Sequence, residues 1–382
     1  TWSAILFSAA RMANPNRPSA CNYGAAFSCL GLGGFVLSVA AMEAHDLNAA
    51  ARHGTLANLP AEVLTAEALT SRNAAGNMPL HVAARSGHLR EIPAGLLTAE
   101  TLTVKNDAGY TPIHHAAIGG HLDQVPGDLL SAESLGLRSN AGYTVFHLAA
   151  AHGHLDQIPV GLLTAEGVAG RTDVGNTLLQ EAAANRTLDR SPAQYVTALT
   201  LAQKNIRGET VLHVAAFNGH LDQVPAALFT AGALRELTNA GDTVFHAAAI
   251  SRHLGQIPAQ HLTEENLVLA SESGFTAIHA AAETGQLGKI PPAQLTAGLL
   301  LTRNDNGDTP LHAAAFEGHL DQIPSEQLTP ANLGTRNYDG LTVIRLAQDR
   351  GFAEQIPESS RPKPPGPIKR FLRNLTRLQA PF

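Results

Sequence analysis

The stretch GDTPLHAAAFEGHLDQIP, residues 307–324, holds the pattern that decides the fold of this chain. Its first glycine and its last proline each belong to a series that recurs every 33 residues. The glycines are Gly76, Gly109, Gly142, Gly175, Gly208, Gly241, Gly274, Gly307 and Gly340. The prolines are Pro60, Pro93, Pro126, Pro159, Pro192, Pro225, Pro258, Pro291, Pro324 and Pro357. Because neither series loses or gains a step, the sequence predicts ten copies of one structural unit.

The residues of this stretch each have a physical role in a helix. Thr309 can cap a helix whose first position is Pro310, where a missing N–H costs nothing. Ala314 and Ala315 let neighbouring helices approach closely. Gly318 accepts a positive φ and ends the helix. The stretch therefore predicts one helix per unit, which starts after Thr309 and ends at Gly318.

A histidine stands five residues after the glycine in seven of nine units: His81, His114, His147, His213, His246, His279 and His312. The tetrapeptide T-P-L-H, with paired alanines and then Gly-His, resembles the ankyrin repeat, whose period is 33 residues and whose signature is T-P-L-H-x-A. The resemblance covers roughly residues 43–357. It implies an all-α fold, an ankyrin-like repeat solenoid with about ten stacked 33-residue units of short helices, in which each unit buries its apolar stripe against its neighbours.

The second half of the unit departs from the ankyrin pattern. In place of a long second helix, the units read His-Leu-Asp-Gln-Ile-Pro or a close variant, as at residues 319–324. A proline there removes a donor and pushes the preceding residue out of the α region. Thr98 can then cap a new short helix with Glu100 in its first turn. The sequence thus predicts one helix and two or three shorter helical pieces in each unit.

Two units depart further from the pattern. In the unit that starts at Gly175, Gln180 replaces the histidine and Arg186 replaces the loop glycine, while Pro192 keeps the register. We interpret it as a degenerate but folded unit. The last unit carries Arg345 and Gln348, polar residues of the kind that a terminal cap needs, and residues 46–50 form the opposite cap.

Composition and charge narrow the possible functions. The two cysteines, Cys21 and Cys29, lie outside the array and cannot form a disulfide framework for it. Cysteine usage therefore does not indicate the cellular compartment of the protein. Residues 1–41 and 361–382 hold eight of the basic residues and no acid, which leaves 18 basic and 32 acidic residues between them, a net charge of −14. Such an acidic array repels nucleic-acid phosphates and argues against a nucleic-acid partner.

The repeated histidines and aspartates invite metal or catalytic hypotheses. The T-P-L-H histidines resemble the structural histidine of the ankyrin family, which ties the loop to the helix start, and a zinc site needs three or four converging ligands rather than a ladder. The Leu-Asp-Gln aspartates recur at Asp123, Asp156, Asp222 and Asp321, whereas an active site is built once from unlike groups. We therefore expect no enzyme, no cofactor and no metal site.

Partner contacts are expected where the units differ from one another. In ankyrin-like modules, partners usually contact the loop residues that flank the glycine and the two positions after the paired alanines. The resemblance carries these positions to Tyr110, Tyr143, Ile206, Arg207, Phe275 and Tyr338 in the loops, and to Ile118, Phe217, Ile250 and Phe316 on the helices. Large apolar residues at exposed sites are typical binding anchors. The alternative is that several of them pack against the next unit.

Two segments flank the array of residues 42–357. Residues 1–41 contain an uncharged stretch after Arg11 and Arg17, and they are either a signal peptide or untranslated sequence upstream of Met42. Residues 358–382 hold a proline-rich linker, and then Ile368, Phe371, Leu372, Leu375 and Leu378 at helical spacing among basic residues. Such a basic amphipathic helix can bind a membrane surface or an acidic groove. We favour docking on the acidic array of its own chain.

These observations predict a protein-protein interaction scaffold that binds another protein through its array, with a cytoplasmic location. The alternative is a secreted effector or membrane-tethered regulator that uses the same array, if residues 1–41 are a signal peptide.

Overall fold

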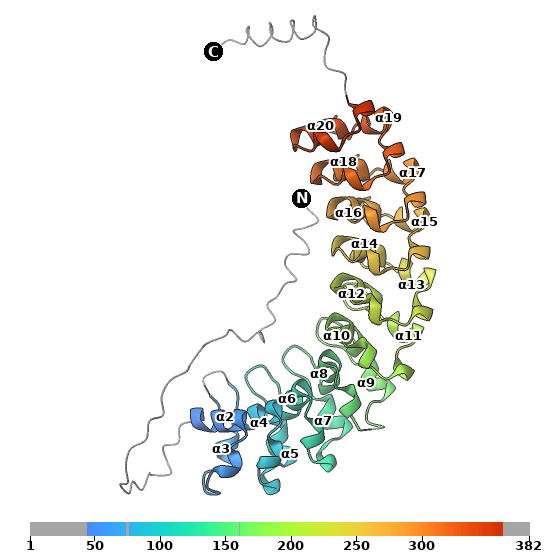
Figure 1. The fold of residues 1–382 in the computed structure, drawn as a ribbon. Helices are drawn as coiled ribbons and strands as arrows, with labels where there is room; N and C mark the ends of the chain where they lie inside the picture. Colours follow the sequence, from blue (N-terminus) through green and yellow to red (C-terminus); the bar gives the residue numbers. More distant parts are fainter. Residues whose placement is uncertain (1–43, 74–75, 160, 362–382) are drawn as a thin grey trace, which may run out of the picture. The chain divides into compact units, whose positions relative to one another are not determined.

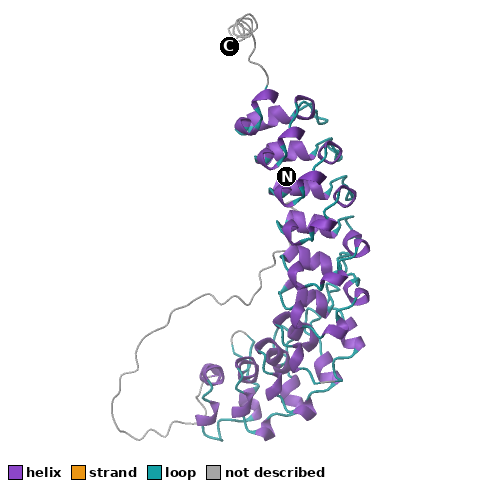
Figure 2. Ribbon diagram, turned by 45° about the vertical axis from the view of Figure 1, so that its right-hand side comes forward, coloured by secondary structure: helices purple, strands orange, loops and turns teal. Residues whose placement is uncertain are grey.

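The structure is a computed structural model that describes residues 44–73, 76–159 and 161–361. The segment 1–41 and the basic tail beyond Arg361, on which we made predictions above, lie outside the described residues. Within the described part, helices and loops make up the array, and strand pairing is limited to two isolated bridges, Ala270 with Thr276 and Arg336 with Thr342 (Figure 2). Ten longer helices stack in order in one column, and the shorter α-helices lie beside them in a second column (Figure 1). The all-α repeat solenoid predicted from the sequence is confirmed.

From α6 onward, the first helix of each unit begins after the predicted capping threonine, whereas α4 begins after Met78. In α18 (Pro310–Glu317), the Thr309 hydroxyl accepts from the backbone N–H of His312, and Gly318 ends the helix with a φ of 82°. The other helices of this column are α2 (Ala44–His53), α4 (Pro79–Ser86), α6 (Pro112–Gly119), α8 (Val145–His152), α10 (Leu178–Ala184), α12 (Val211–Asn218), α14 (Val244–Ile250), α16 (Ala277–Thr284) and α20 (Val343–Asp349).

The proline breaks the second half of each unit as predicted. After α18, the 3-10 helix η16 (Leu320–Gln322) ends at Ile323, whose ψ of 134° is extended, and η17 (Ser325–Gln327) follows Pro324. The 3-10 helices before the proline are η2 (Leu56–Asn58), η3 (Leu89–Glu91), η5 (Leu122–Gln124), η7 (Leu155–Gln157), η8 (Leu188–Arg190), η10 (Leu221–Gln223), η12 (Leu254–Gln256), η14 (Leu287–Lys289) and η18 (Ala353–Gln355). Those after it are η4 (Ala94–Leu96), η6 (Gly127–Leu129), η9 (Ala193–Tyr195), η11 (Ala226–Leu228), η13 (Ala259–His261), η15 (Pro292–Gln294) and η19 (Glu358–Ser360).

A short α-helix completes each unit. In α5 (Ala99–Thr103), Thr98 and Thr101 cap each other's backbone, so the predicted N-cap is present. The remaining short helices are α3 (Ala66–Leu69), α7 (Ala132–Gly136), α9 (Ala165–Ala169), α11 (Ala198–Leu201), α13 (Ala231–Arg235), α15 (Glu264–Leu267), α17 (Ala297–Leu300) and α19 (Pro330–Leu333). Helices of four or five residues are unstable alone, so packing must hold them in place.

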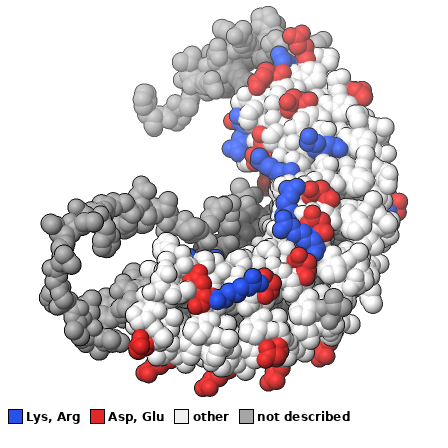
Figure 3. All heavy atoms as spheres, turned by 60° about the horizontal axis from the view of Figure 1, so that its bottom comes forward, with Lys and Arg blue, Asp and Glu red and all other residues white. Residues whose placement is uncertain are grey.

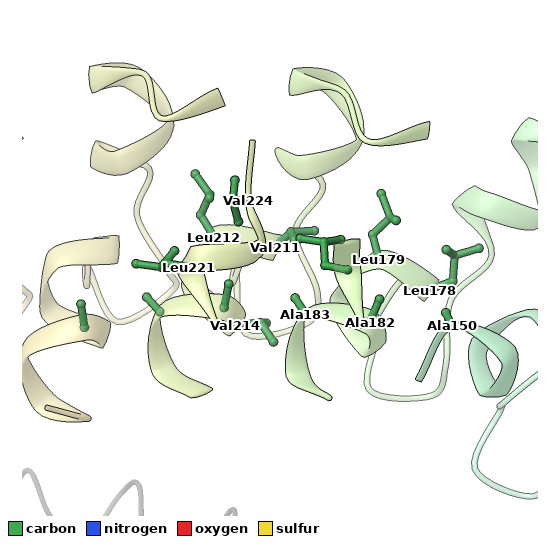
Figure 4. Close-up of a cluster of buried hydrophobic side chains, with 14 of the residues drawn as sticks. Ala150, Leu178, Leu179, Ala182, Ala183, Val211, Leu212, Val214, Leu221 and Val224 are labelled. Atoms are coloured by element: carbon green, nitrogen blue, oxygen red, sulfur yellow. The ribbon is translucent and has the colours of Figure 1, made fainter. Parts of the chain in front are cut away.

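The core runs without interruption through the array because each unit supplies the same apolar positions. Between α8, α10 and α12, the alanine pair Ala182 and Ala183 lies at the helix contact while Leu178 and Leu179 fill the space beside it (Figure 4). Both alanines are fully buried. Any larger side chain there would push the helices apart.

Candidate protein-interaction surface

A histidine bridge fixes each regular unit to the next. In α14, the Thr243 backbone N–H donates to Nδ1 of His246 at 3.1 Å, and Nε2 of the same ring donates to the Phe275 carbonyl at 3.1 Å. The ring therefore carries its proton on Nε2 and is neutral. Burial lowers the pKa of the bridging histidines, to about 4 for His81, His114, His147, His246 and His279. These side chains hold the scaffold together and are not available to a ligand.

The degenerate unit forms the same bridge with an amide. The Thr177 N–H donates to Oε1 of Gln180 at 2.8 Å, and Nε2 of Gln180 donates to the Glu209 carbonyl at 2.7 Å. A carboxamide reproduces the acceptor and donor of neutral imidazole, so the bridge survives the substitution. In α4 the bridge is incomplete: Met78 stands at the cap, and Nδ1 of His81 has no hydrogen-bond partner among the described residues.

The Leu-Asp-Gln motif also has a structural role. Oε1 of Gln157 accepts from the Leu122 N–H at 3.0 Å, and its Nε2 donates to the Gly120 carbonyl, so this side chain clamps the preceding unit. The aspartate of the motif lies at the surface, where Asp123 pairs with Arg90 at 3.0 Å. The regular recurrence of the motif is thus explained by contacts between units.

The loops between each short helix and the next long helix form a continuous column, which we call the loop column. Backbone hydrogen bonds join successive loops, for example from the Asn239 N–H to the Arg207 carbonyl at 2.9 Å. Basic side chains reinforce these links: Lys105 donates to the Arg138 carbonyl and Lys204 to the Leu237 carbonyl. Lys and Arg side chains follow one another along the array with Asp and Glu beside them (Figure 3). The loop column is therefore a pre-ordered surface.

Three aliphatic side chains stand out at the tips of consecutive loops. Val174 is 50% exposed, Ile206 64% and Leu237 48%, and we call them the apolar loop patch. The Ile206 N–H donates to the Val174 carbonyl at 3.4 Å, so the first two are direct neighbours. Leu237 takes the place that Lys204 has in the preceding unit. Five of the seven large apolar side chains that are exposed in the described part lie in the loop column, since Tyr338 and Leu341 of the last loop join these three.

The charges around the apolar loop patch are paired within the chain. Lys204 and Glu236 are 2.9 Å apart, and Arg207 and Glu209 are 2.8 Å apart. Next to Val174, Asp173 receives Arg138 at 2.7 Å. Three ion pairs therefore border the apolar loop patch, and we call them the neutral rim.

The residues that the sequence predicted as partner contacts divide into two groups. Ile206, Arg207, Phe217 and Tyr338 are exposed. The others are more covered: Ile118 is buried, while Tyr110, Tyr143, Ile250 and Phe275 are half-buried against the core. Phe316 is half-buried, and the Arg350 guanidinium lies 3.5 Å from its ring centroid.

Two of the loop tyrosines, Tyr110 and Tyr143, contact buried polar groups. Tyr143 hydrogen-bonds to Glu181, a 6% exposed carboxyl that also accepts from Asn176 at 2.9 Å. Burial raises the pKa of both Glu181 and Tyr143. Tyr110 packs edge-on against His115, whose burial lowers its pKa to about 3. Tyr143, Glu181 and Asn176 thus satisfy one another inside the scaffold, whereas Nδ1 of His115 has no hydrogen-bond partner among the described residues.

The sequence analysis missed Val174, Leu237 and Leu341 as surface residues. A comparison of each loop residue with the residues 33 positions before and after it would have singled out Leu237. Leu237 and Ala270 interrupt a row that is otherwise basic, with Arg72, Lys105, Arg138, Arg171, Lys204, Arg303 and Arg336. An apolar residue at an exposed position that is basic in most units marks a candidate binding surface.

The described part of the chain was also compared with the features of a metal site and of a membrane span. Among the described residues, no group of three or more His, Cys, Asp or Glu side chains could hold a metal ion. No helix there has the length and apolar character that a membrane span requires.

The comparisons with known proteins agree with this geometry. The family model of the ankyrin repeat matches residues 306–323, which include the Thr309-Pro310-Leu311-His312 tetrapeptide. The same sequence of helices recurs in the units along the described chain, so the array is an ankyrin-repeat solenoid. The search of curated proteins found no match.

Proposed function

We propose that the array is a protein-binding scaffold that contacts its partner through the apolar loop patch. Ankyrin repeats are generally protein-interaction modules. The observation that carries the proposal is the exposure of Val174, Ile206 and Leu237 in three consecutive loops. Isolated exposed apolar residues are ordinary, but apolar residues exposed in consecutive loops of one ordered surface are typical of a binding site.

The ordered loops and the neutral rim define the partner further. Because successive loops are already hydrogen-bonded to one another, little conformational freedom is lost when a partner binds. Because the neighbouring charges are paired, the partner should present apolar side chains, and binding should depend weakly on salt. Of the residues predicted from sequence, Ile206, Arg207, Phe217 and Tyr338 remain in this proposal. We propose a binding role rather than a catalytic one, in the cytoplasm.

Affinity capture with matched variants tests this function. The triple variant Val174→Ser, Ile206→Ser, Leu237→Ser removes the apolar loop patch, and Leu199→Ser removes a 79% exposed leucine on the short helix α11 as a control. We expect a protein captured by the unaltered chain to be retained by the control and lost by the triple variant. Binding of the purified partner should weaken by at least about tenfold, which is roughly 1.4 kcal/mol.

Both variants should keep the unfolding midpoint of the parent chain, since all four residues are exposed. Equal capture by the triple variant, or loss with Leu199→Ser instead, would place the binding surface elsewhere.

A further inference from the structure

The last unit of the array leaves apolar side chains uncovered. Ile344 of α20 is half-buried, whereas the residues at the same register in the preceding units, such as Ile278 and Leu311, are fully buried beneath a following unit. In the same unit, Leu341 is 37% exposed and Tyr338 72% exposed, with the Tyr338 ring beside Gly307 of the preceding loop, as Ile206 lies beside Gly175. We call Tyr338, Leu341 and Ile344 the end strip.

A further regular unit would not pack on this end. Gln348 stands where Ala315 lies fully buried in the preceding unit, so a neighbouring helix could not approach as closely. Arg345 replaces the bridging histidine and pairs with Asp349 at 2.6 Å instead. The end strip therefore requires an occupant of a different kind.

The tail of this chain has the composition that the end strip requires. Five apolar residues recur at helical spacing from Ile368 to Leu378. Residues 362–382 also carry five basic residues and no acid. Two basic side chains of the last unit make contacts within the array: Arg350 lies over the Phe316 ring, and Arg361 donates to the Ile356 carbonyl.

Three carboxylates of the last unit remain for the tail. The described part of the chain shows no ion pair to the carboxylates of Asp339, Glu354 and Glu358. The last two units, residues 302–361, carry five basic and nine acidic residues, a net charge of −4. A basic segment is thus attracted to this end of the array, and less so at high salt.

The tail also starts in the right place. The described chain ends at Arg361, in the last unit itself. A proline-rich linker of six residues, the number from 362 to 367, reaches about 19 Å at roughly 3.1 Å per residue, which exceeds the helix spacing of about 10 Å in a packed layer. The apolar loop patch lies three to five units away, at roughly 30–50 Å, and is out of reach of this linker.

We propose that residues 368–378 dock as an amphipathic helix over the end strip and cap the C-terminal end of the array. The apolar side chains of the segment cover Tyr338, Leu341 and Ile344, and its basic side chains meet Asp339, Glu354 and Glu358. This contact lies within one molecule and shares no residue with the apolar loop patch.

Hydrogen exchange of the full-length chain tests the cap. A short isolated helix exchanges freely, so docking should protect the amides of residues 368–378. In the variant Tyr338→Ser, Leu341→Ser we expect this protection to fall at least about tenfold, and the same loss in Leu372→Ser, Leu375→Ser. The control Val174→Ser, Ile206→Ser should leave it unchanged.

Three outcomes would overturn the proposal. Free exchange of residues 368–378 in the unaltered chain would show that the segment does not dock. Equal protection in Tyr338→Ser, Leu341→Ser would place the docking site elsewhere. Protection that rises with protein concentration, together with a dimer in sedimentation, would show that the occupant is a second copy of the chain. Raised NaCl should weaken protection if the carboxylates contribute.

Discussion

The unit of α18 and the unit of α10 adopt the same structure with different residues. Both keep the capping threonine and the buried alanine pair, but α10 has Gln180 for the histidine and Arg186 for the loop glycine. Gln180 and His312 nevertheless each accept from the N–H of their capping threonine and donate to a carbonyl 29 residues away. The fold therefore requires the hydrogen bonds between units and not the histidine itself.

The degenerate unit also differs in what it exposes. Val174 lies in its own loop, and Ile206 and Leu237 lie in the loops of the next two units. The regular unit of α18 has Asn306 at the position of Val174. Substitutions thus accumulate at loop tips, where they change the surface without disturbing the bridge.

Low pH should weaken the histidine bridges but not the glutamine bridge, and this change in unfolding free energy is the largest effect that we expect. A histidine whose pKa is about 4 in the folded chain and 6.5 unfolded stabilises the fold above pH 6.5, and this stabilisation is lost as the pH falls towards 4. At pH 5 each such bridge should lose about 2 kcal/mol, and five together about 10 kcal/mol. The raised pKa values of Asp242 and Glu181 oppose this loss in part. Gln180 does not titrate.

Urea unfolding between pH 7.5 and 5 measures this dependence. Replacing His147 and His246 by glutamine should remove close to two protons from the slope of unfolding free energy against pH. An unchanged slope would mean that these histidines are not held neutral by burial.

At constant pH, a single bridge can be broken or exchanged. His246→Ala leaves the Phe275 carbonyl and the Thr243 cap without their partner, and we expect it to lower the free energy of unfolding by about 3 kcal/mol. His246→Gln restores both hydrogen bonds, as Gln180 does, and should cost less than about 1 kcal/mol. Urea unfolding at pH 7.5 compares the two. Equal losses would show that glutamine cannot replace histidine in a regular unit.

Much of the fold followed from the sequence because each recurring residue has a local role. The cap at Thr309, the helix end at Gly318 and the break before Pro324 depend on near neighbours in the chain, and the structure confirms all three. The resemblance of Thr309 to His312 to the ankyrin repeat further predicted that the units stack one after another in a solenoid.

The candidate surface could be predicted only in part. Whether a loop residue is exposed depends on neighbours about 33 positions away, as for Tyr143, whose hydroxyl reaches Glu181 in the next unit. Ile206 and Tyr338 have no such neighbour to cover them and remain exposed. Packing between units decides whether such a side chain is buried or exposed, and the sequence pattern within one unit does not describe that packing.

The caps offer a smaller test of the same comparison. Thr309 caps α18 and lies 2.8 Å from Nδ1 of His312, whereas Thr342 caps α20 and has no histidine, because Arg345 stands there. We expect Thr309→Ala to cost about 2 kcal/mol and Thr342→Ala about 1 kcal/mol of unfolding free energy. Thermal unfolding of the two variants measures the difference. Equal losses would mean that the hydroxyl does not support the bridge.

The smallest expected effect concerns the helix ends. Arg186 and Arg252 have φ values of 61° and 68°, where other units have glycine. A side chain in this region costs roughly 1–2 kcal/mol, but glycine loses about 0.5–1 kcal/mol more in chain entropy on folding. Arg252→Gly should therefore stabilise the array by about 0.5 kcal/mol in urea unfolding.

Arg186→Gly should gain less, because Arg186 also pairs with Asp222 at 2.8 Å across a solvent-exposed surface. The reverse change, Gly285→Ala, should destabilise the array, since its φ is 71° and a Cβ would lie 3.0 Å from the His319 ring. If Arg252→Gly instead lowers stability, the left-handed arginine is held by contacts that compensate its strain. The degenerate positions would then be adapted to their residues, and not merely tolerant of them.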